Sequence, residues 1–464
     1  MFQDVHTKFP LCRLMGFMIN KIRFCVHKGS PLRAGLFAAL TVFVLVMTAG
    51  PGGICGESGA TSESDVYITG KKAPAKISVV IPDFVREGGF KDPDNRDVRM
   101  ADILADDLNF SGWFDAKRVK EVKGDPAAWA SLDVSNIVQG SYSTDGREIQ
   151  LKCKLIDARG GNVVFDKSYP NALLVMREKV HGISDEIVFN LTGEKGISRT
   201  KMAFVSDMTG SNELYICDYD GRNLLRMTKD GDLCLLPSWS PSGNYITYTS
   251  YKRLNPDLWW TSVSGKSRGI LSFYPGLNTA ASWSPDGSQL AVTLSKDGNA
   301  EIYTMKRDGS GLKRLTFNQS IDTSPTWSPT GREIAFNSDR SGTPQVYIMD
   351  SEGGNVRRLT YMGNYDASPA WSPDGSKIAY VSRENGLFNI YTIDVNGQTV
   401  VRLTYNAGHN ENPSWSPDGR HIVFSSTRGG GKALYSMDAN GENARRLDLP
   451  GNSQTPAWSP LPGA

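Results

Sequence analysis

The tripeptide Trp-Ser-Pro occurs six times in the second half of this chain, at an almost constant interval. Its tryptophans are separated by 44, 44, 44, 44 and 43 residues. A period of about 40–45 residues is typical of a β-propeller, in which each repeat forms one four-stranded blade. The sequence therefore predicts a propeller. The six residues that mark the repeat are Trp239, Trp283, Trp327, Trp371, Trp415 and Trp458.

The repeat that contains Trp371 illustrates how one unit is expected to fold. A Ser-Pro-Asp-Gly turn at residues 372–375 is followed by strand-like runs at 377–382, 388–393 and 400–404. Val, Ile, Tyr and Thr favour strands, whereas Pro, Asp and Gly favour the turn. One such unit cannot bury both of its faces alone, so we expect neighbouring blades to stack on one another.

The two ends of the repeat region complement each other. Residues 201–228 supply three strands without a preceding Trp-Ser-Pro, and residues 455–460 supply one such strand without the other three. Together they make a complete blade. We therefore expect six four-stranded blades in a ring that is closed by the C-terminal strand. Closure removes the sheet edges that the alternative, an open solenoid, would expose.

A basic leader and a short apolar run stand at the start of the chain. Residues 1–33 hold six Lys and Arg residues against one Asp, and an apolar stretch at 36–47 is followed by small residues at 48–53. This order is typical of a secretory signal, and the apolar run is short for a membrane span. We therefore expect a signal peptide and leader at 1–56, and no direct membrane insertion after its removal.

Charge and cysteines restrict the function further. The chain carries a formal charge of +2, but beyond residue 33 it has 45 Lys and Arg against 48 Asp and Glu. The sequence therefore offers no basic patch for nucleic acid. Cys153 alternates with apolar residues and is expected in the core. Cys217 and Cys234 could meet as a disulfide, although no cysteine spacing indicates a metal site.

Residues 65–196 lack the repeat and mix strand and helix patterns. Runs at 77–81, 136–139 and 148–156 are predicted strands, and apolar residues recur at helical spacing over 100–108 and 176–191. This mixture predicts a small α/β domain. We assign it, with an extended N-terminal segment, to residues 57–196, and the propeller to residues 197–464.

Motifs for catalysis give no convincing site. The segment 265–269 matches G-x-S-x-G, but a hydrolase needs a strand before it, a helix after it and later Asp and His partners, whereas here strand-like runs lie on both sides, so we interpret it as a turn between two blade strands. The aspartates of the Pro-Asp-Gly turns are replaced by Ser242 and Thr330 in two copies, which indicates a turn-forming role. The three histidines beyond the leader, His181, His409 and His421, lack ligand spacing.

We therefore predict no catalytic residue, cofactor or bound metal, and a binding module is the leading hypothesis. Two alternatives stay open. One is a secreted propeller hydrolase that acts on peptides or glycans, and the other is a structural ring without a specific partner. Asp322 and Asp366 could also meet in the channel and hold a metal, although nothing in the sequence fixes a ligand geometry.

These features together resemble the TolB family, the periplasmic propeller proteins of the Tol–Pal system in Gram-negative bacteria. The resemblance covers about residues 65–464. Blades of the WSPDG type alone are less specific, because hydrolase-associated propellers share them. The combination with N-terminal motifs is specific, and these motifs lie at 101–108, 111–114, 137–140, 184–193 and 199–206.

The resemblance implies a non-enzymatic, monomeric adaptor of the periplasm that supports outer-membrane integrity and constriction during cell division. It implies two protein partners. The peptidoglycan-associated lipoprotein Pal would dock over the propeller channel, and TolA would capture an extended segment at about residues 57–70. Val66, Tyr67 and Ile68 would be the strand-forming part of that segment.

The Pal-facing surface of the family uses loops immediately before the innermost strands. Where familiar members carry a histidine, this chain has Leu277, whereas Thr323 fits the family pattern. Polar residues in such loops also cap their own backbone, so both roles are open for each residue. The matching positions are Leu277, Asn278, Thr279, Ala280, Asp322, Thr323, Asp366 and Asn410.

Overall fold

A computed structural model describes residues 75–88, 95–122, 134–144, 148–170, 176–405 and 407–463. The expected signal and leader at 1–56, and the expected TolA segment with Val66, Tyr67 and Ile68, lie outside the described residues. Tertiary contacts group residues 68–464 into one compact unit. The boundary expected at residue 196 therefore stays a prediction.

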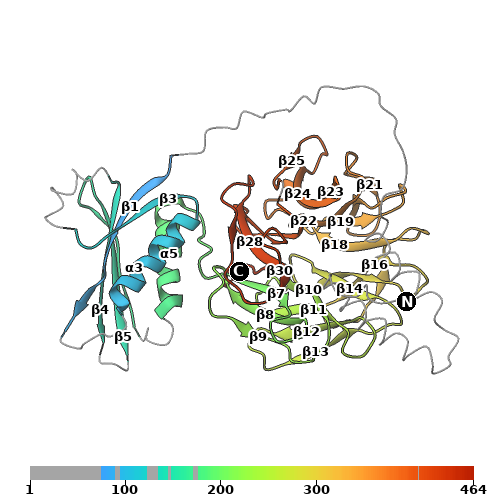
Figure 1. The fold of residues 1–464 in the computed structure, drawn as a ribbon, viewed down its shortest axis with the longest axis horizontal. Helices are drawn as coiled ribbons and strands as arrows, with labels where there is room; N and C mark the ends of the chain where they lie inside the picture. The colour runs from blue at the N-terminus through green and yellow to red at the C-terminus, as the bar shows by residue number, and fades with distance from the viewer. Residues whose placement is uncertain are drawn as a thin grey trace, which may run out of the picture. The chain divides into compact units, whose positions relative to one another are not determined.

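The N-terminal part of this unit is a mixed sheet with two helices on one face (Figure 1). The strand order is β3-β1-β4-β5-β6, and β2 pairs with β4. β1 runs parallel to β3 and β4, whereas β4, β5 and β6 are antiparallel. The elements are β1 (Ile77–Pro82), β2 (Val85–Glu87), α3 (Arg96–Phe110), β3 (Phe114–Val119), β4 (Asn136–Thr144), β5 (Ile149–Asp157), β6 (Val163–Tyr169) and α5 (Met176–Thr192).

The core of this region forms because strand and helix periods place their apolar residues on facing surfaces. One face of β5 alternates Ile149, Leu151, Cys153 and Leu155, all fully buried. Leu104 on α3 and Ile183 on α5 belong to the same cluster. The strands and helices expected over 77–81, 136–139, 148–156, 100–108 and 176–191 are present, and Cys153 is a core residue as expected.

Six four-stranded antiparallel sheets follow, and each is one blade. Blade 1 consists of β10 (Cys234–Trp239), β11 (Tyr245–Ser250), β12 (Asp257–Ser262) and β13 (Arg268–Ser272). Blade 2 consists of β14 (Asn278–Trp283), β15 (Gln289–Leu294), β16 (Glu301–Lys306) and β17 (Lys313–Arg314). Blade 3 consists of β18 (Asp322–Trp327), β19 (Glu333–Ser338), β20 (Gln345–Asp350) and β21 (Arg357–Arg358).

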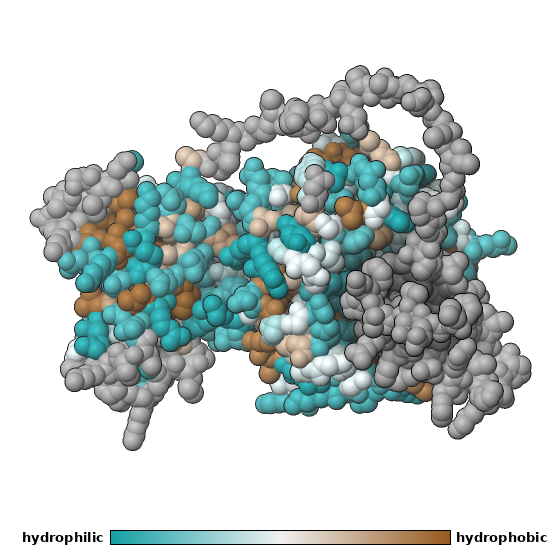
Figure 2. Space-filling view, in the orientation of Figure 1, coloured by the Kyte–Doolittle hydropathy of each residue, from teal (hydrophilic) through white to brown (hydrophobic). Residues whose placement is uncertain are grey.

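Blade 4 consists of β22 (Asp366–Trp371), β23 (Lys377–Glu384), β24 (Leu387–Asp394) and β25 (Val400–Arg402). Blade 5 consists of β26 (Asn410–Trp415), β27 (His421–Ser426), β28 (Ala433–Asp438) and β29 (Arg445–Arg446). Blade 6 combines β30 (Ser453–Trp458) with β7 (Lys201–Ser206), β8 (Glu213–Asp218) and β9 (Leu225–Arg226). Hydrophobic surface on the visible face is broken into separate patches (Figure 2).

Blade 6 closes the ring in the way that the sequence predicts. β30 pairs antiparallel with β7, with Ser453 opposite Ser206 and Trp458 opposite Met202. The Trp458 indole donates a hydrogen bond to the Thr200 hydroxyl at 2.9 Å. The last strand of the chain therefore completes the sheet that the first three propeller strands begin.

The structure tests two further expectations, one about the G-x-S-x-G motif and one about a disulfide. Residues 265–269 lie in and beside the hairpin turn between β12 and β13, where the Gly265 amide donates to the Ser262 carbonyl at 2.8 Å, so the G-x-S-x-G match is a turn as expected. The disulfide considered for Cys217 and Cys234 is not formed. Both residues are buried free thiols, and they lie in the separate sheets of blades 6 and 1.

The α/β region contacts the propeller through a buried polar cluster. Asp107 on α3 accepts a hydrogen bond from the Tyr219 hydroxyl at 2.6 Å and lies 2.7 Å from Nδ1 of His181. Burial raises the pKa of Asp107, although both partners counteract the shift. His181 thus has a structural role, as the sequence analysis expects. No helix in the described ranges is both long and apolar enough to cross a membrane.

Candidate functional site at the channel entry

The inner strands of all blades begin at one end of a central channel and end, with the tryptophans, at the other. We call the first end the entry face and define it by the first residues of the inner strands and the loops that lead to them. These first residues are Cys234, Asn278, Asp322, Asp366, Asn410 and Ser453.

Four exposed aromatic residues lie in the loops of the entry face, one from each of blades 1–4. Each follows the outer strand of its blade and carries an arginine over its ring, with guanidinium-to-centroid distances of 4.6–5.5 Å. Exposed aromatic–arginine pairs are typical of protein-binding hot spots. This aromatic arc consists of Phe273, Phe317, Tyr361 and Tyr405, which are 65, 73, 68 and 63% exposed.

The sequence analysis missed the aromatic arc, although the repeat contains a signal for it. An Arg-Leu-Thr-aromatic motif recurs at 314–317, 358–361 and 402–405. At the equivalent position, blade 5 has the buried Leu449 and blade 6 has Lys229. The arc therefore covers four adjacent blades and stops at the other two.

One buried carboxylate binds the loop that carries Phe317 on both sides of that residue. Glu301, fully buried at the start of β16, accepts hydrogen bonds from the Arg314 guanidinium at 2.9 Å and from the Asn318 amide at 3.1 Å. The Thr316 hydroxyl also donates to this carboxylate. These bonds fix the backbone before and after Phe317, which presents the ring to solvent.

Blade 6 repeats this arrangement with Glu213. Its carboxylate accepts from Arg226 at 3.0 Å, from the Gly231 amide at 2.8 Å and from the Thr228 hydroxyl. Burial alone would raise the pKa of Glu213, but the hydrogen bonds together lower it. In blades 2 and 6, the loops of the entry face are therefore held by hydrogen bonds to a carboxylate, whereas in blades 3 and 4 the equivalent partners are the side-chain amides of Gln345 and Asn389.

The four polar residues predicted in the loops before the inner strands are instead the first residues of those strands, and each is at most 1% exposed. Asn278 accepts from the Tyr274 amide at 2.9 Å, and Asp322 from Arg340 at 2.8 Å. Asn410 accepts from Arg428 at 2.9 Å. Burial raises the pKa of Asp366 despite its hydrogen bonds. The side chains of Asn278, Asp322 and Asn410 cap loops of the entry face, and the part of all four residues in partner binding stays a prediction.

The other predicted positions are only partly buried. Thr279 shares a hydrogen bond of 2.8 Å with Thr249, and Thr323 pairs through its backbone with β19. Ala280 lines the channel, and Leu277 donates its amide to Ser295 at 2.8 Å. These four residues lie next to the buried caps in sequence, and their part in partner binding stays a prediction.

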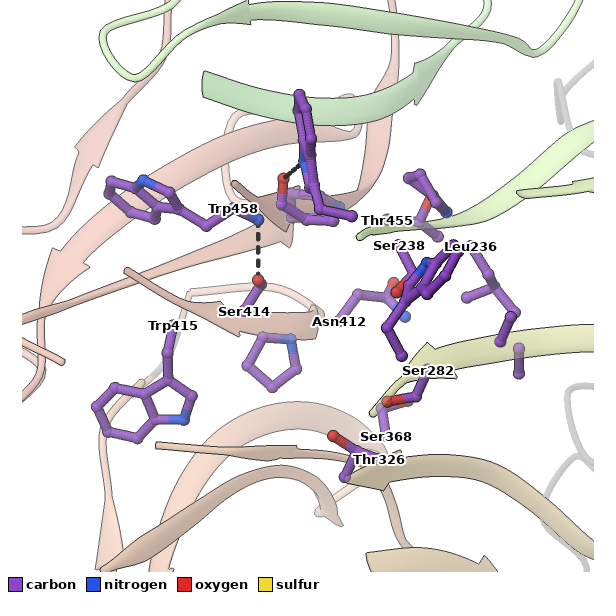
Figure 3. A pocket seen from close by; sticks show the side chains of 18 of the residues that line it. Leu236, Ser238, Ser282, Thr326, Ser368, Asn412, Ser414, Trp415, Thr455 and Trp458 are labelled. Atoms are coloured by element: carbon purple, nitrogen blue, oxygen red, sulfur yellow. Dashed lines mark hydrogen bonds between the residues drawn. The ribbon is translucent and has the colours of Figure 1, made fainter. Parts of the chain in front are cut away.

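The channel between the inner strands contains a cavity of about 420 Å³ (Figure 3). All its lining residues are uncharged, and they are mainly prolines, hydroxyl residues and tryptophans. Neither Asp322 nor Asp366 is among them, so the two acids do not meet in the channel. The described ranges contain no group of three or more His, Cys, Asp and Glu residues arranged to hold a metal.

Each inner strand contains a bulge at which one residue adopts left-handed backbone angles, with φ between 48° and 57°. For a residue other than glycine this conformation costs about 1–2 kcal/mol. Such strain persists where the surrounding structure enforces it, and it is common at binding sites. The six residues all line the channel and are Leu236, Ala280, Ser324, Ser368, Asn412 and Thr455.

These features define a closed six-bladed propeller with a preceding α/β region and an exposed aromatic arc at one end of a neutral channel. The family model described as TolB beta propeller domain matches residues 188–462, and that described as TolB amino-terminal domain matches residues 64–164. The chain belongs to the TolB family.

Curated relatives and a solved structure agree with this membership. The Tol-Pal system protein TolB of Desulfosudis oleivorans is 37% identical over 217 residues, which cover 44% of this chain and 49% of the relative. The Tol-Pal system protein TolB of Desulfotalea psychrophila is 34% identical over 245 residues, which cover 52% of this chain and 55% of the relative. These matches thus span about half the length of the relatives. The crystal structure of TolB from Acinetobacter baumannii is 29% identical, with a TM-score of 0.73, over 83% of this chain and 97% of that one.

Proposed function

We propose that this chain is a non-enzymatic periplasmic adaptor of the Tol–Pal system. It binds the peptidoglycan-associated lipoprotein Pal through the entry face of the propeller and TolA through the N-terminal segment that contains Val66, Tyr67 and Ile68. In this role it supports outer-membrane integrity and constriction during division. The observation that carries the proposal is the aromatic arc around a neutral channel in a chain of the TolB family.

The arc favours a protein partner because exposed apolar rings gain most by being covered. Burial of one aromatic side chain removes on the order of 150–250 Å² from water. The arginines above the rings can reach acceptors of a partner, since most of their donors are not used by the ring contact. A hydrolase, the alternative from another class, would instead need a nucleophile, a base and an oxyanion site in one pocket.

The proposed Pal interface is tested by isothermal titration of residues 57–464 with soluble Pal of the same organism. Phe317→Ala and Thr323→Arg are each expected to weaken binding by about tenfold or more, since hot-spot substitutions cost roughly 2 kcal/mol. Lys229→Ala is the matched control, because Lys229 occupies the position of Phe317 in a blade outside the arc. Unchanged affinity of both test variants would refute this interface.

The TolA part is tested separately. A chain that begins at residue 71 should lose binding to the C-terminal domain of TolA and keep its affinity for Pal. If TolA binding survives this truncation, the N-terminal segment is not its site. A pull-down from the organism's own envelope extract, followed by mass spectrometry, tests whether the adaptor has other partners of higher abundance.

A further inference from the structure

A second cavity, of about 390 Å³, lies between blades 1 and 2 at the opposite end of the channel. We call this end the exit face and define it by the Trp-Ser-Pro turns. Tyr245 and Trp260 of blade 1 form one wall, with ring centroids 5.5 Å apart in an edge-on arrangement. Trp283 and Arg307 of blade 2 lie in the other wall. The cavity is thus aromatic, and its lining also holds one cation, Arg307, and two carboxylates, Asp286 and Asp308.

Blade 1 differs from the other blades at the positions that open this cavity. Trp260 is paired across the strands with Gly269. A Cβ atom at Gly269 would lie 2.7 Å from Nε1 of Trp260, so the glycine makes room for the ring. The equivalent pairs in blades 2–6 are Thr304 and Lys313, Ile348 and Arg357, Thr392 and Val401, Ser436 and Arg445, and Ile216 and Leu225.

In two neighbouring gaps, the residue equivalent to Gly269 is long and basic and spans to the next blade. Lys313 forms an ion pair with Glu352 of blade 3. Arg357 donates a hydrogen bond to the carbonyl of Val395 in blade 4 at 3.0 Å. Glycine cannot bridge the gap in this way, and the space between blades 1 and 2 therefore stays open.

The gap between blades 5 and 6 has an occupant that indicates what such a gap accepts. Phe110, the last residue of α3, enters it and stacks on His421 and Tyr219 with centroids 4.2 and 4.8 Å apart. The Arg445 guanidinium lies 3.8 Å from the Phe110 centroid, and the Trp458 ring lies 6.3 Å away. An aromatic side chain at the end of a helix thus fills this gap.

The two gaps use equivalent positions. His421 and Tyr245 both begin the second strand of their blades, and Trp458 and Trp283 both end an inner strand. Tyr219 and Arg307 both follow the last residue of the third strand. Three of the four side chains around Phe110 therefore have counterparts that line the cavity between blades 1 and 2, and the fourth, Arg445, is replaced by Gly269.

Charge around the cavity restricts the occupant. Asp286 accepts hydrogen bonds from Ser284 and Ser288 within its own turn, and Asp308 accepts from Ser310. Arg307 is exposed, and within the described ranges its guanidinium has no recorded ion-pair partner. A carboxylate, or the free carbonyls at the end of a helix, would complement it.

We propose that the gap between blades 1 and 2 binds one aromatic side chain of a polypeptide partner, with an adjacent carboxylate or helix-end carbonyl on Arg307. The partner repeats, in the open gap, the contact that Phe110 makes in the gap between blades 5 and 6. This site lies on the exit face, so it is independent of the Pal interface proposed for the entry face. A partner could therefore occupy it while Pal is bound.

The probe is the blocked peptide Leu-Asp-Phe-Asp with para-fluorophenylalanine, titrated with residues 57–464 and observed by fluorine NMR. We expect a saturable shift of the fluorine signal. The double variant Trp260→Thr with Gly269→Lys installs the pair of blade 2, which the fold already accommodates, and should weaken binding by about tenfold or more. The matched control, Lys313→Gly in the next gap, should bind as the unmodified chain does.

Two further results decide the chemistry. Arg307→Glu should weaken binding of this peptide and strengthen binding of Leu-Lys-Phe-Lys, because the charge at the rim is reversed. Equal affinity of the double variant and the unmodified chain, with thermal unfolding showing both folded, would overturn the proposal. A last competitor is the N-acetylglucosamine–N-acetylmuramic acid disaccharide. If it displaces the peptide, and Arg307→Glu does not change peptide affinity, the site binds a sugar ring and the polypeptide assignment is overturned.

Discussion

Replacing Trp458 by alanine is expected to destabilise the propeller more than the same change at Trp327. Both indoles are almost fully buried, at 6 and 8% exposure. Burial of 150–250 Å² at ~25 cal/mol per Å² sets an upper value of roughly 4–6 kcal/mol for either ring. Measured changes from a buried tryptophan to alanine cost about 3–5 kcal/mol, and we expect this cost at both positions.

The difference comes from contacts that Trp458 makes and Trp327 lacks. The Trp458 indole donates to the Thr200 hydroxyl at 2.9 Å, whereas Nε1 of Trp327 has no hydrogen-bond partner. Trp458 also lies near Phe110 and His421, with centroids 6.3 Å away in each case. One hydrogen bond contributes about 1 kcal/mol and an aromatic pair about 0.5–1.5 kcal/mol. The hydrogen bond should therefore give an excess of about 1 kcal/mol at Trp458, and the two ring contacts about 1–3 kcal/mol in addition.

Urea unfolding of residues 57–464, followed by far-ultraviolet circular dichroism, measures both free energies without relying on the fluorescence of the residue removed. The Thr200 hydroxyl also donates to the Ile197 carbonyl at 2.6 Å, so Trp458→Ala leaves no unpaired donor that would inflate the difference. A change in the urea dependence of only the Trp458 variant would indicate a partly opened ring. Equal losses at the two positions would refute the reasoning that closure adds stability.

Four shorter predictions follow from burial, turn hydrogen bonds and backbone strain. Burial raises the pKa of Asp366, so its carboxyl group favours folding in acid and disfavours folding as the pH rises. Asp366→Asn should therefore increase the free energy of unfolding by on the order of 1 kcal/mol at neutral pH. Urea titrations should show this gain vanish near pH 4. Asp374 has a lowered pKa because turn hydrogen bonds outweigh desolvation, so Asp374→Asn should destabilise by roughly 0.5 kcal/mol at neutral pH and lose that effect in acid. Burial raises the pKa of Cys217 to about 12 and of Cys234 to about 11, so both thiols should react with a thiol reagent only at the rate of unfolding, and a reductant should leave the melting temperature unchanged. Leu236→Gly should stabilise the ring by up to about 1 kcal/mol in calorimetry, because it relieves a left-handed leucine at φ 51°.

The blade count and the ring closure were predictable because the tryptophan register repeats over the whole second half of the chain. Two unrepeated strands were missed, the short β2 and the longer β3. The strand β3 reads Phe-Asp-Ala-Lys-Arg-Val, with few apolar residues, and its parallel partner β1 begins 37 residues earlier. Such a pairing leaves no local pattern, since only the tertiary contact selects it.

The candidate site was predictable in position and not in side-chain direction. The sequence analysis placed Asn278, Asp322 and Asn410 in loops before the inner strands. In the structure each is the first residue of its strand, and its side chain is buried as a cap. The partners that hold Asp322 and Asn410, Arg340 and Arg428, each lie 18 residues further on. This distance along the chain is not encoded in a local motif, so burial could not be inferred from the polar residue type.

Repetition of one backbone makes the differences between blades informative. The tryptophan and the turn recur in every repeat because each blade must pack and turn in the same way, so they do not distinguish one surface from another. Gly269 and Trp260 depart from the repeat together and open one gap, while Phe110 fills another. On the entry face, the aromatic arc covers blades 1–4 and gives way to Leu449 and Lys229. A partner that docked symmetrically about the channel would gain nothing from this asymmetry. The arc therefore favours a partner seated off the axis, over the four blades that carry exposed rings.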